Sequence, residues 1–254
     1  MPPPSPPPPP PAAFKLFGAS HFAVLGLTVA IPAALVWLVR RRGGERRVRP
    51  LARGLAAVLL VNDLGELAYS ASLDPAHWRE KLPLQLCDWV TFACVAALIW
   101  RRRTAFDLAY FWGLGGSLQA VLTPDLAEDF PRFHFFTFHI AHSGIIVAVL
   151  FLTLGLGMRP YPRSILRAFL WIQLYLVIMA GVNRLLGTNY GYLCYKPAHA
   201  SLLDFLGPWP LYLASLQGLA VGLFFLLYAP YALADRLRAR QESPAQAESQ
   251  DSGG

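Results

Sequence analysis

The chain has 254 residues, of which 55% are hydrophobic and only 15% are charged. Soluble domains carry about a quarter charged residues, so this composition predicts a protein whose main solvent is the lipid bilayer. The formal net charge is +7, but the basic residues stand in short clusters between apolar runs. Such clusters are typical of charges that set membrane topology, and we expect no nucleic-acid partner.

The two ends of the chain differ in composition from its middle. Residues 1–13 are rich in proline and predict an extended, disordered segment that packs against nothing. Residues 235–254 are rich in Gln, Glu, Ser and Ala and predict a disordered cytoplasmic tail. Residues 14–234 then form one transmembrane domain, with no room for a separate soluble domain.

Seven apolar runs of spanning length follow one another through this domain. Breakers such as Asp74-Pro75 and Thr123-Pro124 interrupt the gaps between them. The predicted fold class is therefore all-α, a polytopic membrane bundle of seven transmembrane helices. In chain order, the runs cover residues 20–40, 51–72, 83–100, 104–122, 135–157, 164–186 and 209–231.

The distribution of basic residues predicts which side of the membrane each loop faces. The loops after the first, third and fifth runs, together with the tail, hold 16 Lys or Arg, whereas the other side holds 6. By the positive-inside rule, the richer side is cytoplasmic. We therefore expect a multi-pass protein of the cell membrane, with its N-terminus outside and its C-terminus in the cytoplasm.

Ionisable and amide side chains within the predicted helices gather toward the outer ends. Such side chains are costly in a bilayer, so many at one depth predict a polar cavity that opens outward between the helices. Each also has a structural interpretation, because polar residues of membrane helices often hydrogen-bond a neighbouring helix. The residues that we assign to this predicted site are Asn62, Asp63, Glu66, Gln85, Cys87, Asp88, Gln119, His139, His142, Asn183, Asn189 and Tyr190.

Within this group, Cys87 and His142 form a candidate catalytic pair. An imidazole near a thiol can take its proton and stabilise the thiolate as a nucleophile. Glu66 or Asp63 could orient the imidazole as a third member. A disulfide between Cys87 and Cys194 is the alternative, because both cysteines lie on the predicted outer side.

Two neighbouring features have simpler interpretations. Cys94 lies seven residues beyond Cys87 on the same helix face and fits a packing thiol. His134, His139 and His142 raise the question of a metal, but no tight ligand motif accompanies them. We predict no metal site and no cofactor.

Several stretches of the chain resemble a known family. They lie at residues 82–88 (Leu-Pro-Leu-Gln-Leu-Cys-Asp), 119–125 (Gln-Ala-Val-Leu-Thr-Pro-Asp), 132–144, 183–193 and 196–210. Together they are similar to the YwaF-like bacterial integral membrane proteins, which are themselves similar to the eukaryotic transmembrane protein 164 family. The resemblance covers most of the chain from the third predicted helix onward.

The resemblance implies a seven-helix fold and, from the eukaryotic branch, acyl transfer onto lysophospholipids through an intramembrane cysteine and histidine. The family cysteine falls on Cys87, and the family histidine falls on His142. Where the family pattern often has His, this chain has Gln85, so one imidazole is missing. The leading hypothesis is a phospholipid acyltransferase-like enzyme with a cysteine nucleophile, whose partner is a membrane phospholipid or lysophospholipid.

Two functions without covalent chemistry stay open. A small-solute or proton-coupled transporter or receptor would use Asp63, Glu66 and His142 to bind a cation or to shuttle protons. The sequence has no internal repeat or broken helix, which counts against the transporter. A non-enzymatic scaffold that binds lipids through its outer loops is the other alternative.

Overall fold

The computed structural model describes residues 13–42, 44–196 and 202–251. Within these ranges every one of the seven apolar runs is helical, and the all-α prediction is confirmed. The α-helices are α1 (Ala19–Arg42), α2 (Glu45–Leu73), α3 (Leu86–Trp100), α4 (Arg103–Leu108), α5 (Leu118–Leu122), α6 (Phe133–Leu150), α7 (Pro162–Leu186) and α8 (Leu211–Asp251).

Two π-helical segments complete the longer helices. The segment η2 (Ala109–Ser117) joins α4 to α5, and η3 (Phe151–Gly155) extends α6. Because α4, η2 and α5 follow without a break, they form one helical rod over the fourth apolar run. The short 3₁₀ segments η1 (Pro75–Glu80), η4 (Tyr190–Tyr192) and η5 (Leu202–Leu206) lie between the longer helices.

Among the described residues, four helical stretches are long and apolar enough to cross a membrane, judged by length and composition. They are Ala19–Arg41, Phe133–Gly155, Pro162–Leu186 and Leu211–Gln241. Phe133–Gly155 is 56% buried inside the protein, against 17%, 22% and 11% for the other three. The helix formed by α6 and η3 is therefore the most buried of these four. By contrast, α1, α7 and α8 present apolar side chains outward, as expected of helices that face lipid.

Glycines allow two neighbours to approach α6 closely. A Cβ atom at Gly113 of η2 would lie 2.8 Å from Ile145 Cγ2 of α6. A Cβ atom at Gly144 of α6 would lie 2.8 Å from Leu59 Cδ2 of α2. Small residues at such crossings are typical of membrane bundles, where close backbone packing replaces the hydrophobic effect between helices.

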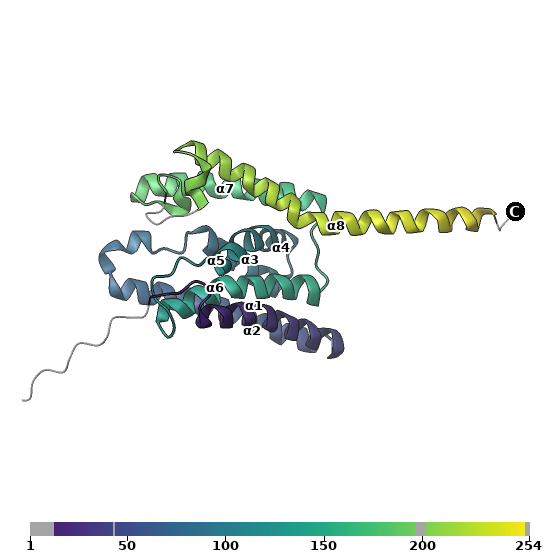
Figure 1. Ribbon diagram of the computed structural model, residues 1–254, viewed down its shortest axis with the longest axis horizontal. Coiled ribbons are helices and arrows are strands. Elements are labelled where there is room, and N and C mark those ends of the chain that lie inside the picture. Colours follow the sequence, from purple (N-terminus) through teal and green to yellow (C-terminus); the bar gives the residue numbers. More distant parts are fainter. Residues whose placement is uncertain (1–12, 43, 197–201, 252–254) are drawn as a thin grey trace, which may run out of the picture.

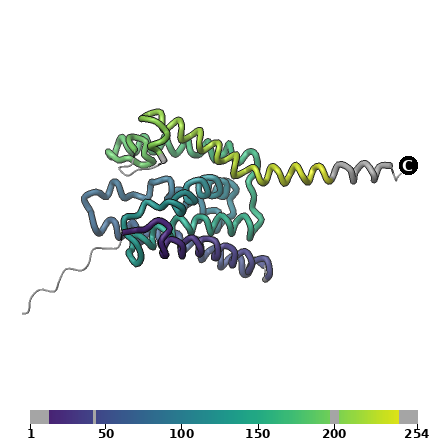
Figure 2. The backbone as a smooth tube through the Cα atoms, in the orientation of Figure 1, coloured from purple at the N-terminus to yellow at the C-terminus, as the bar shows by residue number. Residues whose placement is uncertain are grey.

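The helices are arranged in two groups. Figure 1 shows α7 and α8 side by side, next to a larger group that contains α1 to α6. Figure 2 follows the same path and shows α8 extending well beyond the rest of the molecule. Arg159, in the loop before α7, pairs with Asp235 and so ties this loop to α8.

The ends of the chain depart from the predicted boundaries. Residues 1–12 lie outside the described residues, but Ala13 bridges Glu128 and Phe14 N donates to Ala127 O at 3.3 Å. At the other end, α8 continues to Asp251, where the composition predicts a disordered tail from residue 235. The Ala, Arg, Gln and Glu residues of this segment are good helix formers, so they extend the helix that precedes them.

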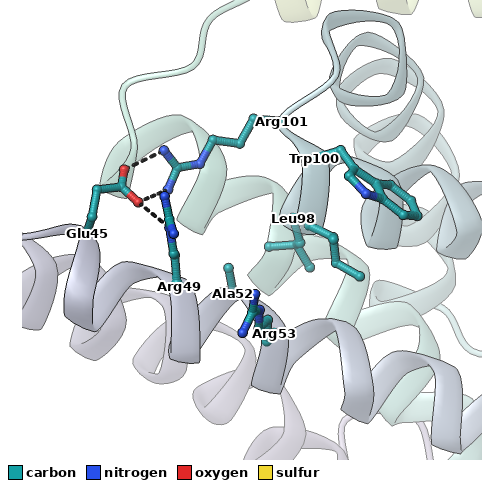
Figure 3. A pocket seen from close by; sticks show the side chains of 8 residues that line it. Glu45, Arg49, Ala52, Arg53, Leu98, Trp100 and Arg101 are labelled. Carbon is teal, nitrogen blue, oxygen red and sulfur yellow. Dashed lines mark hydrogen bonds and ion pairs between the residues drawn. The ribbon is translucent and has the colours of Figure 1, made fainter.

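The end of the bundle where α2 begins and α3 ends is closed by ion pairs. Glu45 accepts from Arg101 Nη1 at 2.6 Å and from Arg49 Nε at 3.2 Å (Figure 3). Nearby, the fully buried Asp107 contacts both Arg103 and Arg167. Glu45 and Asp107 thus each bridge two arginines from different segments.

Candidate functional site

A polar cavity of about 800 Å³ lies at the opposite end of α2 and α3. Its walls come from the second half of α2, the first turns of α3, the first half of α6 and the loop 125–128. This cavity has the size of a small-ligand site. Seven of the residues assigned to the predicted site line it: Asn62, Asp63, Glu66, Gln85, Cys87, Asp88 and His142.

Helical spacing explains why these side chains share one hollow. Asn62 and Glu66 are four apart and therefore project from the same face of α2. On α6, His134, Phe138 and His142 follow the same four-residue spacing and all line the cavity. The close contact of Gly144 with Leu59 brings these two faces together.

Cys87 is the second residue of α3 and is partly buried. The first turn of a helix carries a partial positive charge from its free N–H groups, but burial and the neighbouring carboxylates of Asp63 and Asp88 oppose a thiolate here. The thiol therefore needs a base to take its proton. Cys87 and Cys194 are both free thiols, so the alternative of a disulfide between them is absent from this structure. Cys94 is fully buried among apolar residues and does not line the cavity, in keeping with a packing thiol.

The histidine of the candidate pair has a defined tautomer. His142 Nδ1 lies 2.8 Å from the carbonyl oxygen of Phe138. A carbonyl oxygen only accepts hydrogen bonds, so Nδ1 carries the hydrogen of this bond. In the neutral ring, the lone pair is therefore on Nε2, which is the atom that can take a proton.

Glu66 contacts a different histidine from the one suggested by the sequence. Its Oε1 lies 3.3 Å from His134 Nδ1, and its Oε2 accepts from the Thr137 hydroxyl at 2.7 Å. The Ser70 hydroxyl also donates to Glu66, at 2.8 Å. Glu66 therefore links α2 to the start of α6, and the backbone of Phe138, in place of Glu66, orients His142.

Three other polar residues of the cavity differ in how fully they are bonded. Asp88 accepts from the Gln85 backbone N–H at 2.8 Å and so caps α3. Gln85 Oε1 accepts from Gly191 N at 3.2 Å and ties α3 to the loop after α7. Asp63 Oδ2, by contrast, is buried and has no hydrogen-bond partner among the described residues. Asp63 is thus the carboxylate that is available to a ligand.

Asn183, Asn189 and Tyr190 lie outside the cavity lining and organise the loop after α7. Asn183 donates to Tyr190 O at 3.0 Å and accepts from Tyr190 N at 2.7 Å. Asn189 donates to Tyr195 O at 2.8 Å, and the Tyr190 hydroxyl donates to Arg79 O. These bonds satisfy the polar groups locally, so the three residues fit the structural interpretation.

Gln119 and His139 also lie outside the cavity lining. Gln119 Nε2 donates to Thr123 Oγ1 at 2.6 Å on the same helix. His139 is buried against Phe135, with ring centroids 4.6 Å apart, and stacks on His21 at 6.4 Å. Neither ring nitrogen of His139 has a hydrogen-bond partner among the described residues.

The structure adds polar residues that the sequence assignment left out. His134 and Thr137 join the cavity from α6, and Thr91 joins it from α3. Lys81 also lines it, but its Nζ donates to Ser70 O at 2.6 Å and so caps the end of α2. The spacing of His134 four residues before Phe138 and eight before His142 is the signal that could have identified it.

The described part of the chain holds no group of three or more His, Cys, Asp or Glu side chains arranged to bind a metal ion. His134 is occupied by Glu66, and His139 is turned away into an aromatic cluster. The cavity itself offers a thiol, imidazole and carboxyl groups.

Comparison with known proteins gives three findings. Residues 16–228 match the TMEM164 family. An uncharacterized protein of Treponema pallidum (strain Nichols) is 31% identical over 218 residues, which are 86% of this chain and 90% of that relative. No solved structure matches the chain.

Proposed function

The chain belongs to the TMEM164 family, and on that premise we propose that it is a seven-span membrane protein whose outward cavity transfers acyl groups on phospholipids through Cys87. The observation that carries the proposal is the presence of Cys87 and His142 in one cavity, with the His142 tautomer leaving Nε2 as a base. Apolar side chains such as Leu67, Leu82 and Phe138 line the same cavity and would accommodate an acyl chain.

The topology in this proposal has seven spans, with the N-terminus outside and the C-terminus in the cytoplasm. It is supported by the seven helical segments and by the excess of Lys and Arg at one end of them. On this topology the cavity opens to the outer side, and the ion pairs of Glu45 and Asp107 lie on the cytoplasmic side.

The reaction would proceed in two transfers. His142 Nε2 takes the proton of the Cys87 thiol as the sulfur attacks the ester carbonyl of a donor phospholipid. The ester C–O bond breaks, the lysophospholipid leaves with the proton from His142, and a thioester remains on Cys87. In the second transfer, the hydroxyl of an acceptor lysophospholipid gives its proton to His142 and attacks the thioester, which restores the thiol.

Matched cysteine variants test the proposal. The purified protein in phospholipid vesicles would be incubated with acyl-labelled phosphatidylcholine and a lysophospholipid, and the transferred label measured. Cys87→Ala and His142→Ala should each lower transfer by at least about 100-fold. Cys94→Ala, on the same helix but outside the cavity, should retain transfer. Equal transfer by the wild type and Cys87→Ala would end the proposal.

Asp63 favours a second candidate function, the binding of a small cationic or hydroxylated solute without covalent chemistry. A buried carboxylate oxygen without a partner is costly unless a ligand or water satisfies it. In this case Asp63→Asn and Glu66→Gln should abolish solute binding, measured by calorimetry with a panel of amines and polyols, while Cys87→Ala binds as the wild type does. Loss of binding only in Cys87→Ala would contradict it.

A further inference from the structure

We infer that α7 and α8 hold an anionic phospholipid at the end of the bundle remote from the Cys87 cavity. Two adjoining hollows carry this inference. One, of about 420 Å³, is lined by Arg103, Arg163, Arg167 and Tyr161, with Pro162 and Ser164. The other, of about 670 Å³, is an apolar groove between α7 and α8 that shares Pro162 with the first. A charged hollow that continues into an apolar groove is complementary to a phospholipid, whose charged headgroup is joined to apolar acyl chains.

The first hollow retains positive charge after its internal pairs are counted. Arg103 and Arg167 share the single carboxylate of Asp107, so one of these two charges stays uncompensated. Arg163 is exposed and has no carboxylate partner among the described residues. With no acidic side chain in its lining, the hollow attracts an anion, and arginine forks bind phosphate well.

The second hollow has the chemistry of an acyl-chain groove. Its walls include Ile165 and Phe169 of α7 and Val221 and Phe225 of α8, and Arg236 also lines it. Both helices are apolar enough to span a membrane, and Phe225 is 59% exposed. Because the groove faces outward from α7 and α8, a lipid could enter it sideways from the bilayer.

The arginine hollow at the start of α2 supplies the contrast. It is smaller, about 260 Å³, and Glu45 stands within it between Arg49 and Arg101 (Figure 3). Its own carboxylate therefore occupies the position of an anion, and the apolar groove between α7 and α8 shares none of its lining residues. Arginine content alone does not distinguish the two hollows; the missing carboxylate and the adjoining groove do.

Two arms of one experiment test the charged part. The full chain in neutral detergent would be titrated with dioleoyl phosphatidylglycerol or dioleoyl phosphatidylcholine, and bound lipid counted by native mass spectrometry. Arg163→Gln/Arg236→Gln should lower the preference for phosphatidylglycerol by about tenfold. Arg46→Gln/Arg47→Gln, which removes the same charge from exposed positions at the same end, should leave the preference unchanged. An equal loss in both double variants would overturn the inference.

The apolar part needs its own variant. Ala229 lines the groove from an exposed position, so Ala229→Trp should fill it and lower binding of phosphatidylglycerol. Leu226→Trp, also exposed but outside the groove lining, is the control and should bind as the wild type does. Competition by glycerol phosphate as strong as that by the lipid would identify a free-phosphate site and overturn the lipid assignment. Cys87→Ala should bind lipid here unchanged, so this result is independent of acyl transfer.

Discussion

The two ends of the helical bundle hold their charged side chains in opposite ways. Around Asp107 and Glu45, each carboxylate is matched to two arginines. Around Cys87, the cavity collects several acids, two histidines and a thiol, and Asp63 Oδ2 has no partner among the described residues. At the first end the charged groups are ion-paired with one another, although Asp107 Oδ1 and Arg159 Nε have no hydrogen-bond partner among the described residues. The second end leaves Asp63 Oδ2 without such a partner and in no ion pair, at a cost that functional sites often carry.

The largest expected effect on stability follows from removing the Asp107 carboxylate, which pairs with two arginines at the end remote from Cys87. Asp107→Asn leaves the partly exposed Arg103 and Arg167 without their shared, fully buried partner, and should lower the free energy of unfolding by about 3 kcal/mol. Asp63→Asn in the cavity should change it by less than about 1 kcal/mol, because its Oδ2 loses no hydrogen bond. Thermal unfolding in detergent measures both. A greater loss in Asp63→Asn would reverse the comparison.

The cavity end is also expected to depend on one close helix contact. Gly144→Ala places a methyl group 2.8 Å from Leu59 Cδ2, and Leu59 is only 1% exposed and cannot move aside freely. We expect a destabilisation of about 2 kcal/mol in thermal unfolding, together with altered access to Cys87.

The matched control for this contact is Gly65→Ala on α2, where nothing lies within 4 Å of the added methyl group. This change should stabilise the helix by about 0.5–1 kcal/mol, since Gly is a poor helix former. Equal effects of the two substitutions would show that the contact between α2 and α6 is not tight.

A smaller difference in stability is expected between substitutions of two stacked histidines, His21 and His139. His21 accepts from Phe17 N at 3.0 Å and donates to Val121 O at 2.8 Å, so His21→Phe should cost about 1.5 kcal/mol by leaving these groups unpaired. His139→Phe loses no hydrogen bond and should be neutral or stabilising in the same unfolding assay. If the His139→Phe protein were stable but lost acyl transfer, His139 would have a role in the reaction after all.

The smallest effect is a pH dependence at the end opposite the cavity. The hydrogen bond from Arg101 holds the pKa of the Glu45 carboxyl below its usual value of 4.5. Glu45 therefore contributes stability above that value, and the contribution is lost as the pH falls through the lower, folded-state pKa. The difference in melting temperature between wild type and Glu45→Gln should shrink between about pH 5 and pH 3 and in high salt. A constant difference would show that the pair contributes nothing.

Local properties of the sequence account for much of this protein. Each of the seven hydropathy runs coincides with a helical segment, although α8 continues about twenty residues beyond its run, because a stretch of that length and apolarity has few alternatives to a helix. Counting residues along each helix predicts a similar depth for Asn62, Glu66, Cys87 and His142, and these side chains line one cavity. At the tail, composition predicts disorder from residue 235, whereas α8 continues to Asp251.

Tertiary structure alone decided which of the outer polar side chains meet. Asn183 belongs to the same predicted group of outer polar residues as His142, yet it bonds Tyr190 of the loop after α7 instead of joining the cavity. Glu66 reaches His134 and not His142 because of how α2 and α6 are rotated where Gly144 meets Leu59. The hydropathy pattern predicts the position of a residue along its helix. The direction in which its side chain points depends on contacts between helices that are far apart in the chain.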